Sequence, residues 1–351
     1  MLNYFFLFGI CLFFSLFLTP IAKWGAFRFG ILDKPGIRKI HDKPIPLTGG
    51  IAVFLSFVLA LALLGAVSRE LLWVLLIGMI FVGFGLIDDF GIMIRARYKI
   101  WVRLLFSFAF IYLSGIHFNF FHAGWINWLL TACFITFMTN SMNMLDGMDG
   151  LVSGICLIAS GFFALLAYNS GQGELILIAV AIMGATLGFL KYNFNPASIF
   201  LGEAGATFLG FIMAVMAIKL NVYSLWNIAF SLGIERLQII SFIVPLIILG
   251  IPIFDTYFVF ANRFLHDIKF SQPGKDHSHH RIHLMGFSQR ATVLTLYAIQ
   301  IILGSIALAM VRADLQQFFS LLMIVAVFFV GFTIFLSRAD VYHASGGKNE
   351  G

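Results

Sequence analysis

The chain has 351 residues, of which 61% are hydrophobic and only 11% are charged, and its mean hydropathy is +0.98. Soluble globular proteins carry about 25% charged residues, so this composition excludes an ordinary soluble enzyme, a disordered chain and a coiled coil. The three cysteines lie in apolar runs without metal-type spacing, which argues against a disulfide-stapled secreted domain. The class that remains is a polytopic membrane protein.

A helix needs about 20 apolar residues to cross the hydrocarbon core of a bilayer. The first apolar run lacks a preceding basic segment and a cleavage motif, so we expect a retained span and not a signal peptide. The predicted fold is all-α, with one integral-membrane domain over residues 1–340 and a short cytoplasmic polar tail over 341–351. In chain order, the apolar runs predict about eleven transmembrane helices, at 3–21, 49–67, 71–87, 101–120, 125–142, 151–168, 173–190, 199–218, 239–258, 292–311 and 315–336.

The basic residues predict the orientation of the chain. The loops that alternate on one side, together with the tail, hold 18 of the 22 Lys and Arg residues. The positive-inside rule places this side in the cytoplasm, with the N-terminus outside and the C-terminus inside. The net charge of +6 is therefore attributed to topology and not to nucleic-acid binding. The same side holds 12 of the 16 carboxylates, which the rule does not explain, so we expect a shared polar site there.

The first candidate group is the pair Asp88 and Asp89, which ends an apolar run. Adjacent carboxylates repel each other unless a cation lies between them or one is protonated. Lys99, eleven residues after Asp88, is a nearby cation in the sequence. A solvated helix end is the alternative interpretation.

The second group is the segment 140–150, with Asn140, Asn143, Asp146 and Asp149 spaced by three residues. This spacing places two carboxamides and two carboxylates along one side of a helix end. A calcium loop is disfavoured, because the alternating ligands and distal Glu of an EF-hand are missing. A plain polar loop remains the alternative.

The third group contains Asn193, Phe200 and Glu203, at the start of a predicted span. An acidic side chain there is costly without a partner, and a Mg²⁺ ion, which prefers oxygen ligands, would supply one. Helix capping by Glu203 is the alternative.

The fourth group is a histidine-rich loop with His277, His279, His280 and Arg281. These side chains can bind a diphosphate through hydrogen bonds and charge. A zinc site is a rival interpretation, which the neighbouring basic residues disfavour. A basic segment ending at Lys43 precedes the second span and suits either a phosphate or anionic lipid headgroups.

Each group is a modest signal, but together they supply carboxylates, amides, histidines and cations on one predicted face. This inventory suits a complex of magnesium with a pyrophosphate substrate, because metal ions and basic side chains stabilise phosphoryl oxygens.

The motifs also resemble a known family. DKPGIRKIHDKPIPLTGG, GLIDDFG, NSMNMLDGMDGL, NFNPASIFLGEAGATFLGF, PIFDT and KDHSHHRIHLMGFS follow one another from about residue 31 to 290. In this order they resemble the polyprenyl-phosphate N-acetylhexosamine-1-phosphate transferases, most closely the WecA/TagO type. The resemblance implies ten or eleven spans and a Mg²⁺-dependent cytoplasmic site, with Mn²⁺ as the alternative ion. It also implies transfer of a sugar 1-phosphate from a UDP-sugar to a lipid phosphate, with release of UMP.

Residue roles follow from the resemblance alone. Asp88, Asp89 and Asp146 match catalytic positions, and Glu203 matches the magnesium ligand, shared with Asp88 and Asp89. The remaining matches are to substrate-binding positions, among which Asp149 and Phe200 would hold the uracil. These expected substrate-binding residues are Lys43, Lys99, Asn140, Asn143, Asp149, Asn193, Phe200, His277, His279, His280 and Arg281.

This chain departs from the family pattern at two positions in these motifs. Glu203 stands where the family usually has Asp, which bears on metal geometry and donor preference, and Phe90 replaces a common Arg. Arg281-Ile282 after the histidines, in place of Phe-Glu, favours a simple HexNAc donor over UDP-MurNAc-pentapeptide.

The expected activity is therefore Mg-dependent transfer of HexNAc-1-phosphate, most simply GlcNAc-1-phosphate, to undecaprenyl phosphate at the cytoplasmic face of the inner membrane. An aspartate would orient the attacking phosphate, remove a proton or form an aspartyl-phosphate. Rival hypotheses are another donor such as a UDP-deoxy-HexNAc, an ion or sugar transporter, and a pseudoenzyme. A homodimer is left open.

Overall fold

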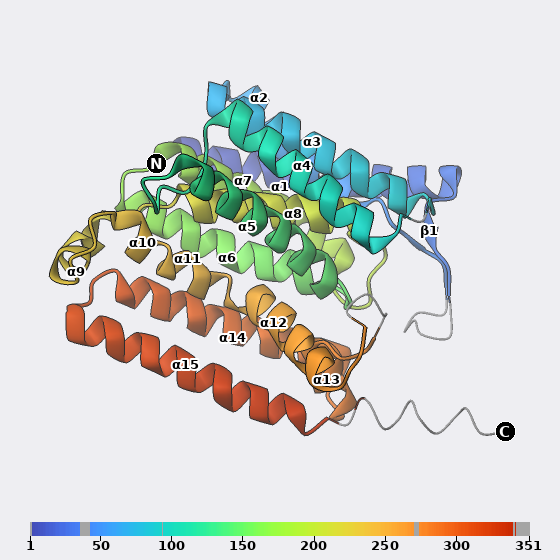
Figure 1. Ribbon diagram of the computed structural model, residues 1–351. Helices are drawn as coiled ribbons and strands as arrows, with labels where there is room; N and C mark the ends of the chain where they lie inside the picture. Colours follow the sequence, from blue (N-terminus) through green and yellow to red (C-terminus); the bar gives the residue numbers. More distant parts are fainter. Residues whose placement is uncertain (1, 36–42, 93, 270–273, 340, 342–351) are drawn as a thin grey trace.

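The computed structural model describes residues 2–35, 43–92, 94–269, 274–339 and 341. Its described part is almost entirely helical, and Figure 1 shows long helices lying side by side in one bundle. The helices in the first 219 residues are α1 (Leu2–Phe29), α2 (Gly49–Leu63), α3 (Arg69–Asp89), α4 (Ala96–Ser114), α5 (Gly124–Leu145), α6 (Leu151–Asn169), α7 (Gly173–Asn193) and α8 (Gly202–Lys219). The elements after them are η1 (Tyr223–Leu225), α9 (Trp226–Ser231), α10 (Leu237–Ser241), α11 (Ile243–Ile248), α12 (Gly250–Leu265), α13 (Ser278–Leu284), α14 (Gln289–Met310) and α15 (Leu315–Ser337).

A two-residue antiparallel pair, β1 (Leu32–Asp33) and β2 (Ile45–Pro46), closes the segment between α1 and α2. Pro46 accepts a hydrogen bond from the backbone N–H of Phe200, which ties this hairpin to the segment before α8. The hairpin lies at the same end of the bundle as the end of α15, opposite the start of α1 (Figure 1).

Each predicted span corresponds to one helix except 239–258, which overlaps α10, α11 and α12, and not every helix meets the requirements of a membrane span. Within the described residues, seven helices are long and apolar enough to cross a membrane, or eight if one bent pair counts as a single span. α2, with 15 residues, is short, and α4 carries three cationic residues among its first eight. The chain is therefore a multi-pass all-α membrane protein, while the number eleven and the side of each terminus stay predictions.

The apolar run expected at 239–258 is not one straight helix. The segment Leu237–Ile248 meets α12 at a bend of 81°, at Leu249 and Gly250. A Cβ on Gly250 would lie 2.9 Å from Leu303 Cδ1 and 3.1 Å from Phe329 Cζ, so glycine lets the bend pack against α14 and α15. The bend directs α12 toward the histidine-rich segment.

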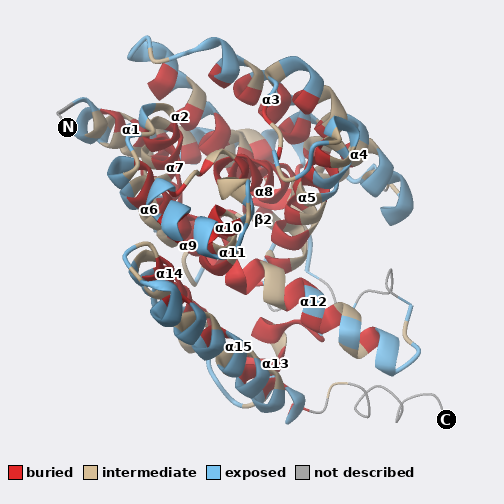
Figure 2. Cartoon of the chain, turned by 60° about the vertical axis from the view of Figure 1, so that its left-hand side comes forward, coloured by how far each residue is buried: buried red, intermediate tan, exposed pale blue. Residues whose placement is uncertain are grey.

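α8 lies at the centre of the bundle, and every residue from Ala204 to Ile218 is buried. It packs on α3 and α5, and its glycines and alanines allow close backbone approach. Figure 2 shows the contrast with α15, whose outward side is exposed along its length. The helix that carries Glu203 is therefore held on all sides by protein.

Candidate active site

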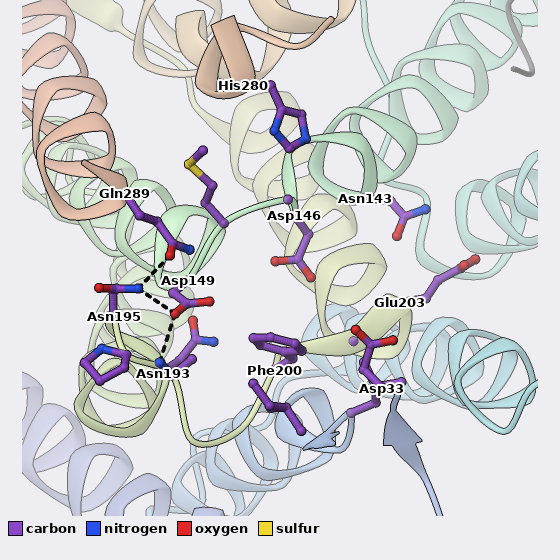
Figure 3. A pocket seen from close by; sticks show the side chains of 17 residues that line it. Asp33, Asn143, Asp146, Asp149, Asn193, Asn195, Phe200, Glu203, His280 and Gln289 are labelled. Carbon is purple, nitrogen blue, oxygen red and sulfur yellow. Dashed lines mark hydrogen bonds between the residues drawn. The ribbon is translucent and has the colours of Figure 1, made fainter. Parts of the chain in front are cut away.

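A cavity of about 610 Å³ lies among the polar segments that join the helices. Its walls come from the β1–β2 hairpin, the end of α5, the segment between α7 and α8, α13 and the start of α14. The polar side chains that line it are those of Asp33, Asn143, Asp146, Asp149, Asn193, Asn195, Glu203, His280 and Gln289 (Figure 3). The predicted convergence of separate loops on one polar site is therefore present in the structure.

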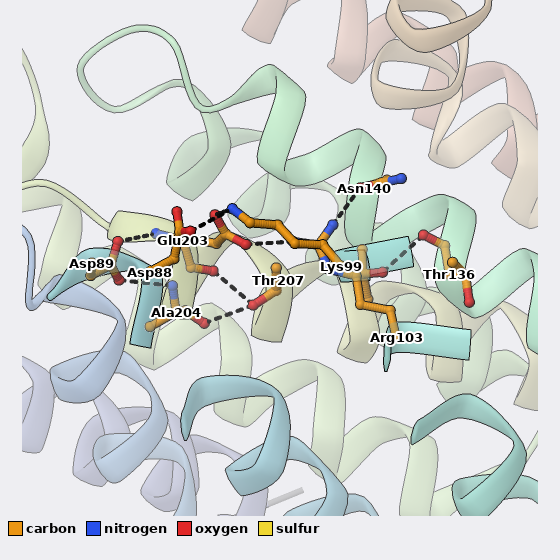
Figure 4. A network of polar contacts seen from close by, with 10 residues as sticks. Asp88, Asp89, Lys99, Arg103, Thr136, Asn140, Glu203, Ala204 and Thr207 are labelled. Atoms are coloured by element: carbon orange, nitrogen blue, oxygen red, sulfur yellow. Dashed lines mark hydrogen bonds and ion pairs between the residues drawn. The ribbon is translucent and has the colours of Figure 1, made fainter. Parts of the chain in front are cut away.

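Glu203 is bound by two cations from α4. Lys99 Nζ lies 2.5 Å from Glu203 Oε2 and 2.8 Å from Asp88 Oδ1. Arg103 Nη2 lies 2.8 Å from Glu203 Oε1, and its other terminal nitrogen donates to Asn140 Oδ1 (Figure 4). Lys99 and Arg103 are one helical turn apart, so both reach the same carboxylate. Asn140 thus supports Arg103 and does not line the cavity.

Asp89 has a different role from its neighbour. Its two carboxylate oxygens accept the backbone N–H groups of Glu203 at 2.9 Å and Ala204 at 3.0 Å, at the start of α8. A carboxylate is stabilised at a helix N-terminus because it satisfies free N–H groups and meets the positive end of the dipole. Gly202 has φ +75°, and a Cβ there would lie 2.7 Å from Asp89 Oδ2, which explains the glycine before Glu203. Asp89 therefore fixes where α8 begins.

Asp146 follows α5 and lines the cavity. It has no hydrogen-bond or ion-pair partner among the described residues. Burial, with the negative charges of Asp89 and Asp149 adding to it, raises the pKa of Asp146 to about 7. Asp146 is thus a carboxylate whose charge is uncompensated on the cavity wall.

The segment between α7 and α8 supplies the opposite wall. Asn193 Oδ1 accepts hydrogen bonds from the Gly150 N–H at 3.2 Å and the Ser153 hydroxyl at 3.0 Å, and its amide nitrogen donates to the Ile199 carbonyl. Asn193 therefore joins the start of α6 to this segment. Phe200 lies beside it on the cavity wall and faces Asp146 in Figure 3.

The histidine-rich segment is anchored by two buried ion pairs. His277 Nδ1 lies 2.7 Å from Asp255 Oδ2 on α12, and Arg263 holds Asp276 with contacts of 2.6 and 2.8 Å. Burial favours a lower pKa for His277, but the Asp255 carboxylate outweighs it and the pKa is raised. Burial also holds the pKa of Asp276 up, and Arg263 lowers it overall. These contacts fix the start of α13.

The next two histidines of the segment, His279 and His280, are held in a neutral form. His280 lines the cavity, and burial, together with the charges of His277 and Lys275, lowers its pKa to about 4. His279 is fully buried, and a Cβ on Gly147 would lie 2.3 Å from its Nε2. Burial, reinforced by His280, lowers the pKa of His279 well below its usual value.

Six of the expected substrate-binding residues are not among the residues that line the cavity: Lys43, Lys99, Asn140, His277, His279 and Arg281. Arg281 is buried and donates to the carbonyls of Asp276, Leu336 and Ala339, so it attaches α13 to the end of α15. Lys43 is exposed just before β2 and is not a lining residue. The rest of the basic segment before it, residues 36–42, lies outside the described residues, as does the expected tail apart from Val341.

Several residues that the structure places at the site were not among the expected site residues. Asp33, Asn195 and Gln289 line the cavity, and Arg103 binds Glu203. The signal for Arg103 was its position four residues after Lys99. Gln289 follows Ser288, whose hydroxyl accepts the Ala291 N–H as an N-cap, but no spacing in the sequence links it to Asp149.

The donor atoms of the cavity suit a hard divalent cation. Among the described residues, no three His, Cys, Asp or Glu side chains are arranged to bind a metal ion together. However, the uncompensated Asp146 carboxylate and Glu203 line the same cavity, and both offer oxygen ligands. Glu203 already forms ion pairs with Lys99 and Arg103, so a metal ion bound to Glu203 would share its carboxylate with these two side chains. The chemistry therefore fits Mg²⁺, with Asp146 as the carboxylate that most needs a cation.

Comparison with known proteins identifies the class of molecule. Residues 71–221 match the model of "Glycosyl transferase family 4". A "Probable undecaprenyl-phosphate N-acetylglucosaminyl 1-phosphate transferase" of Bacillus subtilis (strain 168) is 32% identical over 323 residues, covering 89% of this chain and 86% of the relative. The chain is thus a membrane-embedded glycosyl-1-phosphate transferase.

Two further relatives are named as enzymes of the same class. A "Decaprenyl-phosphate N-acetylglucosaminephosphotransferase" of Mycobacterium tuberculosis (strain ATCC 25618 / H37Rv) is 29% identical, covering 80% of this chain and 76% of the relative. A "Phospho-N-acetylmuramoyl-pentapeptide-transferase" of B. subtilis is 27% identical, covering 79% and 87%. The chain belongs to glycosyl transferase family 4, the polyprenyl-phosphate N-acetylhexosamine-1-phosphate transferases, as its motifs predicted.

Proposed function

We propose that this protein transfers HexNAc-1-phosphate, most simply GlcNAc-1-phosphate, from a UDP-sugar to undecaprenyl phosphate. The products are undecaprenyl-diphospho-HexNAc and UMP, the first of which would begin a cell-surface glycan. The observation that carries the proposal is the cavity in which segments far apart in the sequence place carboxylates, amides and a neutral histidine beside the Lys99–Glu203–Arg103 cluster.

The reaction is a displacement at phosphorus. A phosphate monoester oxygen of the lipid attacks the β-phosphorus of the donor, and the bond from that phosphorus to the bridging oxygen breaks. The bridging oxygen leaves with UMP. A phosphate monoester has a second pKa near 6, so at pH 7 the attacking group is largely ionised. Positioning and charge stabilisation therefore account for most of the catalysis expected of the protein.

The residues of this chain divide that work. Asp88, one-quarter exposed and bound to Lys99 beside the cavity lining, is the carboxylate to which we assign orientation of the attacking phosphate or removal of its residual proton. Asp89 acts through α8, because its oxygens hold the backbone at Glu203 and Ala204. His280 is neutral and can donate one hydrogen bond to a phosphoryl oxygen without adding charge.

Asp146 and Glu203 are the residues we assign to Mg²⁺, with Mn²⁺ as a substitute. A divalent cation bound there would neutralise the oxygens of the donor diphosphate. We further propose that the cavity opens to the cytoplasmic face of the inner membrane, where a nucleotide sugar and a lipid phosphate can meet.

The direct test measures UMP release by the purified full-length protein with undecaprenyl phosphate, Mg²⁺ and a panel of UDP-sugars. The panel contains UDP-GlcNAc, UDP-GalNAc, a UDP-deoxy-HexNAc and UDP-MurNAc-pentapeptide. We expect UMP from UDP-GlcNAc, loss of release with EDTA, and loss with Asp146→Asn. Gln316→Met, at an exposed position on α15, is the control and should retain full activity. Release of no UMP from any donor would overturn the proposal.

A further inference from the structure

Three side chains on the cavity wall form a chain of hydrogen bonds that the proposed mechanism does not use. Asn195 Nδ2 donates to Asp149 Oδ2 at 2.9 Å and to Gln289 Oε1 at 2.6 Å (Figure 3). The three residues come from the segment after α5, the segment before α8 and the first residue of α14. All three line the cavity beside Phe200.

The direction of these hydrogen bonds is fixed by chemistry. An ionised carboxylate can only accept, so Asn195 must turn its amide nitrogen toward Asp149. The same nitrogen donates its second hydrogen to Gln289, so Gln289 must accept it with its carbonyl oxygen. The amide nitrogen of Gln289 is consequently left as a donor, and it lies on the cavity side of its carbonyl oxygen in Figure 3. Asp149 thus determines, through Asn195, which end of Gln289 is free.

Backbone contacts hold this arrangement in place. The Ala197 N–H donates to Asp149 Oδ2 at 2.9 Å, and Arg290 Nε donates to the Asn195 carbonyl at 2.9 Å. The Ser288 hydroxyl caps α14 one residue before Gln289. Because both ends of the hydrogen-bond chain are anchored, the cavity wall presents a carboxylate acceptor and an amide donor in a fixed relation, next to an aromatic ring.

We propose that Gln289 is a nucleobase-specificity residue and that Asn195 is the positioning residue that sets its polarity. This inference rests on the proposed function, because it requires a uridine nucleotide in the cavity. Uracil carries an N3–H donor flanked by carbonyl acceptors, so its N3–H can donate to Asp149 while one carbonyl accepts from the Gln289 amide nitrogen. Cytosine has an unprotonated N3, which would face the Asp149 carboxylate as a second acceptor. Sites that hydrogen-bond a ligand group discriminate strongly against analogues that lack it.

The test compares binding of UMP and CMP to the purified full-length protein by isothermal titration calorimetry. Wild type should bind UMP more tightly than CMP. Gln289→Met keeps the length of the side chain and removes its donor, so UMP affinity should fall about tenfold and the UMP-to-CMP ratio should fall with it. Asn195→Ala should lower the same ratio, because Gln289 is then free to turn. Gln316→Met is the matched control and should change neither.

Kinetics distinguish recognition from a structural defect. The KM for the UDP-sugar should rise in Gln289→Met while kcat stays within about twofold, because the base is bound equally in the ground and transition states. An unchanged UMP-to-CMP ratio in both folded variants would overturn this inference and leave the proposed function standing. Failure of wild type to prefer UMP over CMP would overturn the inference, and failure of UMP release with every donor would overturn the proposed function.

Discussion

Asp88 and Asp89 are adjacent in the chain, yet their side chains meet different surroundings. Asp89 accepts two backbone N–H groups at the start of α8, whereas Asp88 binds Lys99 at a partly exposed position (Figure 4). Two neighbouring residues at a helix end point about 100° apart, so one can reach α8 while the other faces the polar cluster. One carboxylate thus stabilises the fold and the other is available for chemistry.

This difference predicts different stabilities for two alanine variants. Asp89→Ala removes both acceptors from buried N–H groups and should lower the free energy of unfolding by about 1 to 3 kcal/mol. Asp88→Ala removes one partly exposed ion pair, and Lys99 keeps its contact with Glu203, so the change should cost about 1 kcal/mol or less. Thermal unfolding in detergent measures both. Equal loss in the two variants would contradict the capping role of Asp89.

For individual residues, the sequence predicted which residue types gather at the site, but not which groups they bind there. Asp146, Asp149, Asn193 and Phe200 were expected and line the cavity. Arg281 was expected to bind substrate, whereas its guanidinium donates to the backbone carbonyls of Asp276, before α13, and Leu336, in α15. A charge in a motif does not reveal whether it faces a ligand or the backbone, because that depends on which helix end lies opposite.

Between elements, close approach of helix backbones decides where α8 lies. A Cβ on Gly85 of α3 would lie 2.4 Å from Ala204 Cα, while a Cβ on Gly83, two residues earlier, would meet nothing within 4 Å. Small residues at helix contacts of this kind are typical of membrane bundles. The contact places Asp89, four residues after Gly85, over the start of α8.

Alanine at these two glycines should therefore have opposite outcomes. Gly85→Ala forces α3 away from α8 and should destabilise the protein by about 2 to 3 kcal/mol, with reduced UMP release. Gly83→Ala should leave stability unchanged or slightly higher, because alanine favours the helix. The melting temperatures of the two variants, purified side by side, provide the comparison. A stable Gly85→Ala protein would show that the α3–α8 contact can relax.

The attachment of α13 to α12 should depend on pH. The pKa of His277 is raised in the fold by Asp255, so the protonated form is favoured there. The stabilisation from the His277–Asp255 ion pair is complete below pH about 6.5, the ordinary pKa of histidine. It is lost as the pH rises through the raised pKa of His277. His277→Gln should therefore cost about 3 kcal/mol at pH 6 and less at pH 9. If the melting temperature of wild type exceeds that of His277→Gln by the same margin at about pH 6 and about pH 9, this prediction is refuted.

The bend before α12 marks the limit of prediction for elements. Apolar length alone predicted one helix over 239–258, and the apolar residues are indeed helical. Hydropathy records how apolar a segment is and not its direction. Gly250 and the flanking Pro245 and Pro252 indicate that a helix can break here, but none of them predicts the 81° angle. The bounds of α6, α7 and α15 agree with prediction within three residues, whereas α1 continues to Phe29, eight residues beyond its predicted end, and α4 covers 96–114 where 101–120 was expected.

For the whole molecule, the positive-inside rule makes a prediction that the fold alone does not decide. Asn169, at the end of α6, and Lys275, before α13, are both exposed and are expected on opposite faces. In a protein whose native cysteines are replaced, Asn169→Cys should react with an impermeant maleimide in intact cells. Lys275→Cys should react only after permeabilisation. The reverse pattern would place the cavity outside and would exclude a cytoplasmic donor.

The central position of α8 also bears on how such a sequence can diverge. A helix that meets lipid, such as α15, can exchange one apolar residue for another of different shape, because fluid acyl chains adapt to it. α8 meets other helices on every side, so a change in shape there must be matched by a change in a neighbour. Among natural variants we therefore expect substitutions to accumulate along α15. Substitutions in α8 should occur together with a matching change in a neighbouring helix and should leave the position of Glu203 unchanged.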